Sequence, residues 1–327
     1  MVVTSLLLVA GLVLLVLGGE FLVRGAVRIA AHVGISPMLV GLTVVGMGTS
    51  APELAASVQA SFAGSPGIAL GNIAGSNIAN LLLILGSSAL IAPMLVPRSA
   101  LWRDGGVGVA ATLALIVCGH TLGLSRVAGL ALLACLVGYI VFAYRQERLG
   151  RDHSAAYDRA TAMVEADPAL TPRQADGETL WKPIALVLFG LVLIVSGGNL
   201  LVTSAIAIAA ELGVSDEVIG LTVVAIGTSL PELATSVIAA LKKEGEIALG
   251  NVLGSNIFNV LFIGGVTGTI APTVVPPSIL AVDLWVVLGA SLAVMLFALT
   301  GGRLNRLEGA ALVALYGTYT MFTVGAF

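Results

Sequence analysis

The chain repeats itself over almost its whole length. Residues Gly41–Gly86 align without a gap on Gly220–Gly265, a shift of 179 positions, and 28 of the 46 aligned residues are identical. Further along, the same shift brings Asp104 onto Asp283. Self-similarity at one fixed spacing is the mark of a duplicated structural unit. The sequence therefore predicts two halves that share one arrangement of elements.

Composition places both halves in a membrane. Of the 327 residues, 58% are hydrophobic and 10% are charged, whereas soluble domains have about 25% charged residues. Each half divides into five apolar stretches close to the roughly 17–25 residues that a helical span requires. These stretches are 4–24, 37–62, 68–92, 104–121, 125–144, 183–209, 217–241, 246–270, 280–299 and 307–326. We predict an all-α polytopic membrane protein of ten transmembrane helices, with repeats at 1–145 and 182–327 and a polar linker at 146–181.

The basic residues predict how the spans are oriented. Five is an odd number, so the second half must enter the membrane from the opposite side, as an inverted repeat. With the N-terminus outside, 14 of the 15 lysine and arginine residues fall on one face, and only Arg126 falls on the other. Such residues concentrate on the cytoplasmic side of membrane proteins. We therefore expect both termini outside a plasma (inner) membrane and the linker in the cytoplasm.

Two of the apolar stretches contain the same helix-breaking motif. Gly48–Glu53 reads Gly-Thr-Ser-Ala-Pro-Glu, and Gly227–Glu232 reads Gly-Thr-Ser-Leu-Pro-Glu. Proline lacks the amide hydrogen that a helix interior needs, so Pro52 and Pro231 predict breaks in helices 2 and 7. A charged side chain at membrane depth costs roughly 2.5–3.5 kcal/mol on insertion scales. Two glutamates after two matching prolines are hard to explain as packing, and they predict an ion-binding site.

Oxygen-bearing side chains accompany the glutamates at helical spacing. Residues four apart share one helix face, and each half has such a stripe on its second span and another on its third. The stripes comprise Thr49, Glu53, Ser57, Asn72, Ser76, Asn80, Thr228, Glu232, Ser236, Asn251, Ser255 and Asn259. Asn77 and Asn256 lie one position off the second stripe in each half.

The stripes offer the ligands of a hard cation. Calcium takes about six to eight oxygen ligands, and neither stripe has a cysteine or histidine for a softer metal. A membrane asparagine is often only a link between helices, so that interpretation stays open beside the ligand one. Glu20 and Arg24 are four apart on the first span, and we expect a local ion pair there, since Asn199 and Thr203 replace them in the second half.

The two motifs resemble those of the cation/calcium exchanger superfamily, which includes the sodium/calcium exchangers and their prokaryotic relatives. That superfamily carries GTSxPE on spans 2 and 7 and GNxxGSNIxN/D on spans 3 and 8. In this chain the motifs stand at Gly48–Glu53, Gly227–Glu232, Gly71–Asn80 and Gly250–Asn259. The resemblance covers essentially all ten expected spans.

The resemblance implies where the ions bind. Glu53 and Glu232 would form the calcium site, completed by the carbonyls of Thr49 and Thr228. Sodium would be held nearby by Ser50, Ser76, Ser229 and Ser255 and by the backbone at Gly46 and Ala225. The first and sixth spans would slide during alternating access. Some relatives have aspartate at the position of Asn259, so only two carboxylates remain in the predicted pocket here, and the counter-ion stays open.

The expected function is a secondary active antiporter that exports Ca²⁺ in exchange for Na⁺, with Ca²⁺ between Glu53 and Glu232 at the midplane. A Ca²⁺/H⁺ antiporter using the same glutamates is one alternative, and a cation channel is another, because broken helices also build pores. We expect no enzymatic activity, since no histidine or lysine lies on either stripe to activate Ser50 or Ser229. The expected partners are the transported cations and the lipid bilayer, without nucleic acid or a cofactor, and the expected unit is a monomer.

Overall fold

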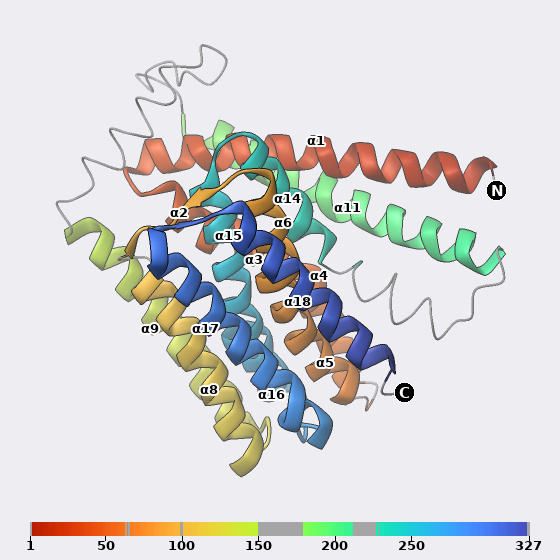
Figure 1. Cartoon of the computed structure of the whole chain (residues 1–327), viewed down its shortest axis with the longest axis vertical. Coiled ribbons are helices and arrows are strands. Elements are labelled where there is room, and N and C mark those ends of the chain that lie inside the picture. Colours follow the sequence, from red (N-terminus) through yellow and green to blue (C-terminus); the bar gives the residue numbers. More distant parts are fainter. Residues whose placement is uncertain are drawn as a thin grey trace.

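The computed structural model is mostly helical (Figure 1). It describes residues 2–62, 64, 66–98, 101–149, 179–211, 227 and 229–325. Among these residues, seven helices are long and apolar enough to cross a membrane, namely Val3–Val33, Pro66–Ile91, Leu101–Thr121, Arg126–Gln146, Trp181–Ser204, Gly245–Ile270 and Ile279–Gly301. The chain is therefore a multi-pass membrane protein, as its composition predicts.

In the first half, helices occupy all five predicted stretches, and three stretches change between α and π geometry. The elements are α1 (Val2–Val33), α2 (Pro37–Val40), η1 (Gly41–Val45), α3 (Gly46–Thr49), α4 (Ala51–Phe62), α5 (Pro66–Ile78), η2 (Ala79–Ile84), α6 (Leu85–Ile91), η3 (Leu101–Gly105), α8 (Gly106–Thr121) and α9 (Arg126–Leu149), where η is a π-helical turn.

The described part of the second half repeats this order. Its helices are α11 (Trp181–Glu211), α14 (Leu230–Leu241), α15 (Gly245–Phe258), η5 (Asn259–Ile263), α16 (Gly264–Ile270), η6 (Ile279–Asp283), α17 (Leu284–Gly301) and α18 (Arg306–Gly325). Two short strands, β1 (Met94–Leu95) and β2 (Arg303–Leu304), pair antiparallel and join a loop of the first half to one of the second. Most of the predicted linker lies outside the described residues, and so does most of the part of the stretch 217–241 that precedes α14.

Three predicted spans are not among the seven apolar helices. The stretch 37–62 is divided into short elements, and of the stretch 217–241 mainly α14 is described. The third, α18, is a helix of 20 residues but is not among the seven. A helix that breaks inside the membrane leaves pieces too short to span it alone. The count of ten spans therefore stays a prediction.

Helices α1 and α11 lie side by side across one end of the molecule (Figure 1). A Cβ on Gly11 would lie 2.8 Å from the carbonyl oxygen of Gly197, and one on Gly18 would lie 2.8 Å from that of Gly190. Glycine permits this close approach between membrane helices. Because higher numbers on α1 meet lower numbers on α11, the two helices run antiparallel. The repeat shift relates Gly11 to Gly190 and Gly18 to Gly197. Gly11 therefore contacts the repeat counterpart of Gly18, and Gly18 contacts the repeat counterpart of Gly11.

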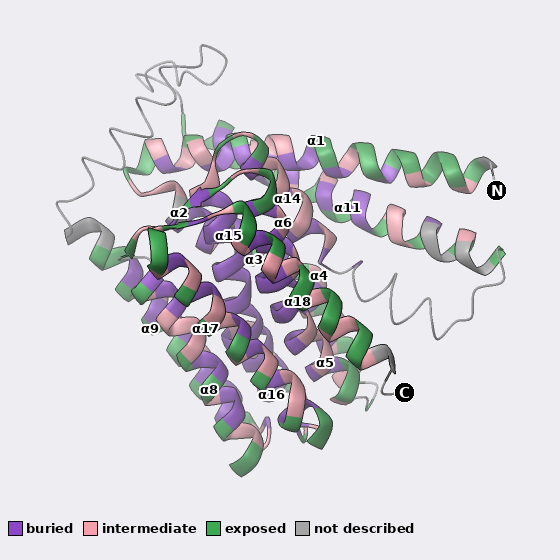
Figure 2. Cartoon of the chain, viewed as in Figure 1, coloured by how far each residue is buried: buried purple, intermediate pink, exposed green. Residues whose placement is uncertain are grey.

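The remaining helices pack across the two halves. α6 packs against α18, where Gly86 and Gly309 meet, and α16 packs against α9, where Gly265 and Gly129 meet. Buried residues concentrate in α15, whereas the outer helices expose many apolar side chains (Figure 2). Exposed apolar helix faces of this length are suited to contact with lipid. The described polar residues of the stripes are buried, except Asn72, which is half-buried.

Candidate cation-binding site

The backbone leaves helical geometry at the serine of each repeated motif. Ser50, between α3 and α4, has φ −80° and ψ 6°, and Ser229, just before α14, has φ −91° and ψ 9°. The proline of each motif then falls in the first turn of the following helix, where its missing N–H has no helical partner to lose. The predicted break in the stretch 37–62 is thus present. Glu53 and Glu232 lie in the first turns of α4 and α14, where the helix dipole favours a negative charge.

Each glutamate accepts a hydrogen bond from the motif of the other half. Ser50 Oγ donates to Glu232 Oε1 at 3.2 Å, and Ser229 Oγ donates to Glu53 Oε1 at 3.5 Å. Both glutamates are 1% exposed. The two motifs, far apart in the sequence, therefore form one enclosed site.

An asparagine from the next helix fixes each glutamate-bearing helix. Asn72 Nδ2 donates to the carbonyl of Glu53 at 3.1 Å and to Ser57 Oγ at 2.9 Å. In the second half Asn251 makes the corresponding two bonds, at 3.3 Å and 2.9 Å. These bonds hold α4 on α5 and α14 on α15, so the two predicted stripes of each half do come together. Whether Asn72 and Asn251 also bind a cation stays a prediction.

A cluster of four asparagines joins α5 and η2 to α15 and η5. Asn77 Nδ2 donates to the Asn256 carbonyl at 3.3 Å, and Asn256 Nδ2 donates to the Asn77 carbonyl at 3.2 Å. Asn80 Nδ2 donates to Asn256 Oδ1, and Asn259 Nδ2 donates to Asn77 Oδ1, both at 3.0 Å. No role was predicted for Asn77 and Asn256, although their equal offset from the stripe in both halves was a usable signal. Asn80 and Asn259 also lie in π-helical turns, which recur at functional sites.

Four fully buried oxygens of this site have no hydrogen-bond partner among the described residues. They form two pairs that the repeat shift relates: Glu53 Oε2, Glu232 Oε2, Asn80 Oδ1 and Asn259 Oδ1. An unsatisfied buried polar atom costs about 1–3 kcal/mol, and more when it is charged. Each of the four is an acceptor, so a cation within reach would satisfy it.

The other predicted ligands of the described region surround the glutamates. Thr49 Oγ1 lies 3.3 Å from both Asn251 Oδ1 and the Gly46 carbonyl, and Ser255 Oγ donates to that carbonyl at 3.5 Å. Ser229 Oγ also lies 3.5 Å from Ser76 Oγ. Two predicted ligands, Ala225 and Thr228, lie outside the described residues.

The composition of the site limits what it can bind. Within the described ranges, no three histidine, cysteine, aspartate or glutamate side chains gather as a metal centre. Any cation held here therefore meets two carboxylates and otherwise neutral oxygens. Such a donor set suits calcium or sodium better than a soft transition metal.

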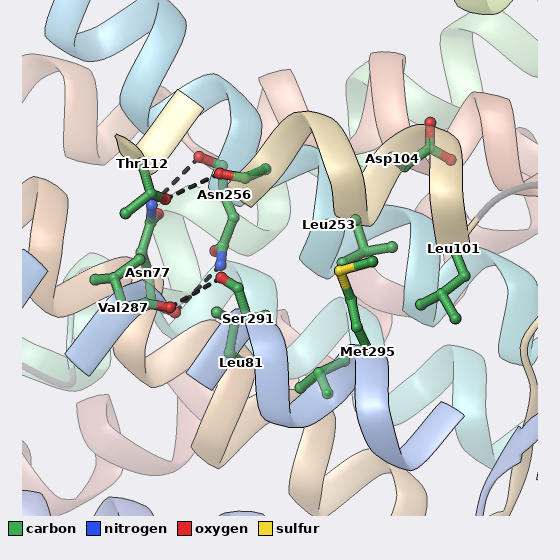
Figure 3. A pocket seen from close by; sticks show the side chains of 13 residues that line it. Asn77, Leu81, Leu101, Asp104, Thr112, Leu253, Asn256, Val287, Ser291 and Met295 are labelled. Atoms are coloured by element: carbon green, nitrogen blue, oxygen red, sulfur yellow. Dashed lines mark hydrogen bonds between the residues drawn. The ribbon is translucent and has the colours of Figure 1, made fainter. Parts of the chain in front are cut away.

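A small pocket adjoins the asparagine cluster (Figure 3). Its volume of about 20 Å³ leaves room for one water molecule. Two pairs of polar side chains that the repeat shift relates line it, Asn77 with Asn256 and Thr112 with Ser291. Asp104 lies at the far end from Asn77 (Figure 3), and it accepts hydrogen bonds from Tyr139 at 2.8 Å and from Arg103 at 2.6 Å. The pocket therefore offers no unpaired carboxylate to a cation.

A helical membrane domain that encloses two carboxylates and their shift-related oxygens defines a cation-transporting membrane protein. A family profile described as sodium/calcium exchanger protein matches residues 3–145 and 182–325. The chain belongs to this sodium/calcium exchanger family.

Individual relatives match over nearly their whole length. CaxA of Alkalimonas amylolytica, a protein named as an antiporter, is 38% identical over 323 residues, which cover 98% of each chain. The sodium/calcium exchanger MaX1 of Methanosarcina acetivorans is 36% identical over 337 residues, covering 96% of each. A structure of the sodium-calcium exchanger NCX_Mj matches with a TM-score of 0.81 at 33% identity, over 97% of each chain. Fold, site and relatives together identify a cation antiporter.

Proposed function

We propose that this antiporter exchanges Na⁺ for Ca²⁺ across the plasma membrane and exports Ca²⁺ by alternating access. The observation that carries the proposal is a set of four buried oxygens that have no hydrogen-bond partner within the described part of the chain, two from carboxylates and two from amides. Oxygen ligands with two formal negative charges suit one calcium ion. The relatives whose names describe sodium/calcium exchange support the same two cations.

In this proposal Ca²⁺ binds between Glu53 and Glu232 near the membrane midplane. The amide oxygens of Asn80 and Asn259 and the carbonyls of the threonines before each break complete the calcium site. Sodium takes the neighbouring oxygens when calcium has left. The predicted ligands are thus Glu53, Glu232, Thr49, Thr228, Ser50, Ser229, Ser76, Ser255, Asn80, Asn259, Asn72, Asn251 and the backbone at Gly46 and Ala225.

Charge couples the two cations. Two bare carboxylates are too costly to enclose at membrane depth, so the carrier does not cross between its two states with an empty site. One Ca²⁺ or two Na⁺ discharge the pair and permit the transition. Each cation can shift the equilibrium only by its different affinity for the two states.

The proposal includes the predicted topology. Ten spans form two inverted repeats at 1–145 and 182–327, with both termini outside and the linker 146–181 in the cytoplasm. The antiparallel contact of α1 with α11 supports an inverted pair, and the reciprocal bonds of Asn77 and Asn256 support a two-fold relation between the halves. The 14 basic residues on one predicted face support the orientation.

Proton exchange is the second candidate, and a specific observation favours it. Asparagine stands at both 80 and 259, so the site has two carboxylates and no third. Two protons neutralise such a pair as completely as two sodium ions do. A Ca²⁺/H⁺ antiporter would then use the same glutamates as proton acceptors.

Calcium uptake into proteoliposomes tests the proposal. An outward Na⁺ gradient should drive uptake of radioactive calcium, and Glu53→Gln or Glu232→Gln should abolish it. Glu308→Gln is the matched control, because Glu308 caps α18 by accepting from the Asn305 amide and glutamine serves that position too. Undiminished uptake in both site variants would contradict the assignment. Uptake driven by a pH gradient without sodium would replace Na⁺ by H⁺ as the counter-ion.

A further inference from the structure

Glu20 on α1 contacts two positive charges, one on its own helix and one just after α14. Its Oε1 lies 2.5 Å from Arg24 Nε on the same helix and 2.8 Å from Lys242 Nζ. The Glu20 and Lys242 side chains are 27% and 19% exposed, so the contact is largely withdrawn from solvent. The local pair expected between Glu20 and Arg24 is present, but it is part of a three-residue cluster. We call Glu20, Arg24 and Lys242 the inner triad.

Lys242 connects the triad to the cation site. It is the first residue after α14, the helix that carries Glu232 in its first turn. α1 packs along α14, where Gly19 lies against Ile238. The triad therefore ties α1 to the far end of a helix that holds one of the two site carboxylates.

The triad has no equivalent in the other half. The repeat shift places Asn199 opposite Glu20, Thr203 opposite Arg24 and Ala63 opposite Lys242. None of these three can carry a charge. Among the described residues, α11 also lacks a packing contact with α4 comparable to that of α1 with α14. The ion pair thus exists at one end of the molecule only.

We propose that the inner triad is a one-sided latch that favours the exchanger conformation in which α1 rests on α14. This inference rests on the proposed function, because it concerns the two states of alternating access. Two halves of the same design would by themselves make the two states similar in free energy. A contact available to one state alone removes that balance. By the predicted topology, the latched side faces the cytoplasm.

Arg24 explains why the latch can open. When α1 leaves α14, Glu20 loses Lys242 but keeps Arg24 one helical turn away. Opening the latch therefore does not leave the half-buried carboxylate without a positive partner. Glu20 and Lys242 act as positioning residues, since neither belongs to the cation site.

Distances between spin labels test the latch in the full-length protein in lipid nanodiscs. One label replaces Val33 at the end of α1, and the other replaces Leu307 at the start of α18; both side chains are exposed. Cys118 and Cys135 are first replaced by alanine. The two states should give two label distances, and the less populated one belongs to the state in which α1 has left α14. Lys242→Met should raise the population of that distance roughly twofold to fivefold, as expected for an ion pair worth up to about 1 kcal/mol. The difference from wild type should shrink at high salt.

The matched control is Lys243→Met, which changes the neighbouring exposed lysine. It should leave the distance populations unchanged. Reversing all three charges, with Glu20→Lys, Arg24→Glu and Lys242→Glu, should restore the wild-type populations. If Lys242→Met does not fold, Glu20→Gln removes the same ion pair from the other helix.

The outcomes separate the latch from the proposed function. Equal populations in Lys242→Met and Lys243→Met, or failure of the reversed triad to restore them, would overturn the latch. If the wild type shows no cation-driven calcium uptake but Lys242→Met still changes the distance populations, the proposed function is overturned and the latch stands. A supporting result also includes a changed ratio of calcium half-saturation between the two membrane faces in Lys242→Met.

Discussion

Asn77 and Asn256 each donate a side-chain hydrogen bond to the main-chain carbonyl of the other, at 3.3 Å and 3.2 Å. The two residues are separated by the repeat shift of 179, so the bonds relate the halves by an approximate two-fold axis. The same residues accept the amides of Asn259 and Asn80. The centre of the protein is thus fixed by bonds that neither half can form alone.

We predict that Asn77→Ala and Asn256→Ala destabilise the protein by similar amounts, about 1–3 kcal/mol each, because each leaves buried polar partners unsatisfied. The double variant should cost less than the sum, since the two residues share their bonds. Chemical unfolding of the purified protein in detergent measures all three. Ser291→Ala is the control, because that hydroxyl donates only to Val287 in its own helix. Very unequal single variants would contradict the two-fold arrangement.

The contact between α1 and α11 should not tolerate a methyl group. In Gly18→Ala the new Cβ would lie 2.7 Å from Ile194 Cγ1 and 2.8 Å from the Gly190 carbonyl oxygen, and overpacking of this kind costs roughly 1–3 kcal/mol. Gly138→Ala is the matched control, because nothing lies within 4 Å of a Cβ there. The control should be neutral or stabilising, since alanine favours a helix by about 1 kcal/mol over glycine. Thermal unfolding in detergent compares the two, and equal midpoints would refute the close contact.

Asn259→Asp should lower the stability of the protein without a bound cation and increase the stabilisation that calcium provides. The substitution replaces the amide that donates to Asn77 Oδ1 at 3.0 Å by an oxygen that repels it, and it adds a third carboxylate. We expect a lower melting temperature without calcium and a larger rise on adding calcium, since a ligand that binds only the folded state stabilises it. Asn305→Asp is the control, because Asn305 is the N-cap residue of α18 and aspartate caps helices as well as asparagine does. A calcium-induced rise no larger than that of wild type would argue against Asn259 as part of the cation site.

Glu244, in the turn between α14 and α15, should make stability depend on pH. Burial raises the pKa of its carboxyl above the ordinary value of 4.5, the neighbouring Glu246 adds to the rise, and Lys242 opposes it. The folded state therefore binds this proton more tightly than the unfolded state, and stability falls as pH rises through 4.5 toward the folded pKa. Glu244→Gln removes that loss, so its melting temperature should exceed that of wild type at neutral pH and match it below pH 4.5. A constant difference across the pH range would exclude Glu244 as the source.

The sequence predicted the parts of the site that depend on local spacing. Glu53 and Ser57 share a face of α4, and a break accompanies the proline of each motif, because both features follow from local helix geometry. Thr49 belongs to α3, before that break, so its place beside them does not follow from the spacing alone. The duplication then doubled every such inference. The family was predicted from the resemblance of the motifs, and the helical fold and membrane location from the apolar stretches; all three are confirmed.

What the sequence could not predict are contacts set by the docking of distant helices. Ser50 bonds Glu232 rather than the glutamate of its own motif, and Glu20 pairs with Lys242 as well as Arg24. The π-helical turns at Asn80 and Asn259 had no signal in the spacing either, because a π turn depends on how the helix fits its neighbours. The number of spans is harder to establish for a related reason, since a helix interrupted at the site no longer has the length of a span.

The glycine contacts between helices of different halves also constrain how the protein is made. Gly86 meets Gly309, and Gly129 meets Gly265, so the partner of each first-half surface is synthesised only after the first half has left the ribosome. Until then the polar side chains of α4 and α5 are in the membrane without their hydrogen-bond partners from the second half. Insertion of the second half therefore completes the first, and the two halves produced as separate chains should be stable only when they are made in the same cell.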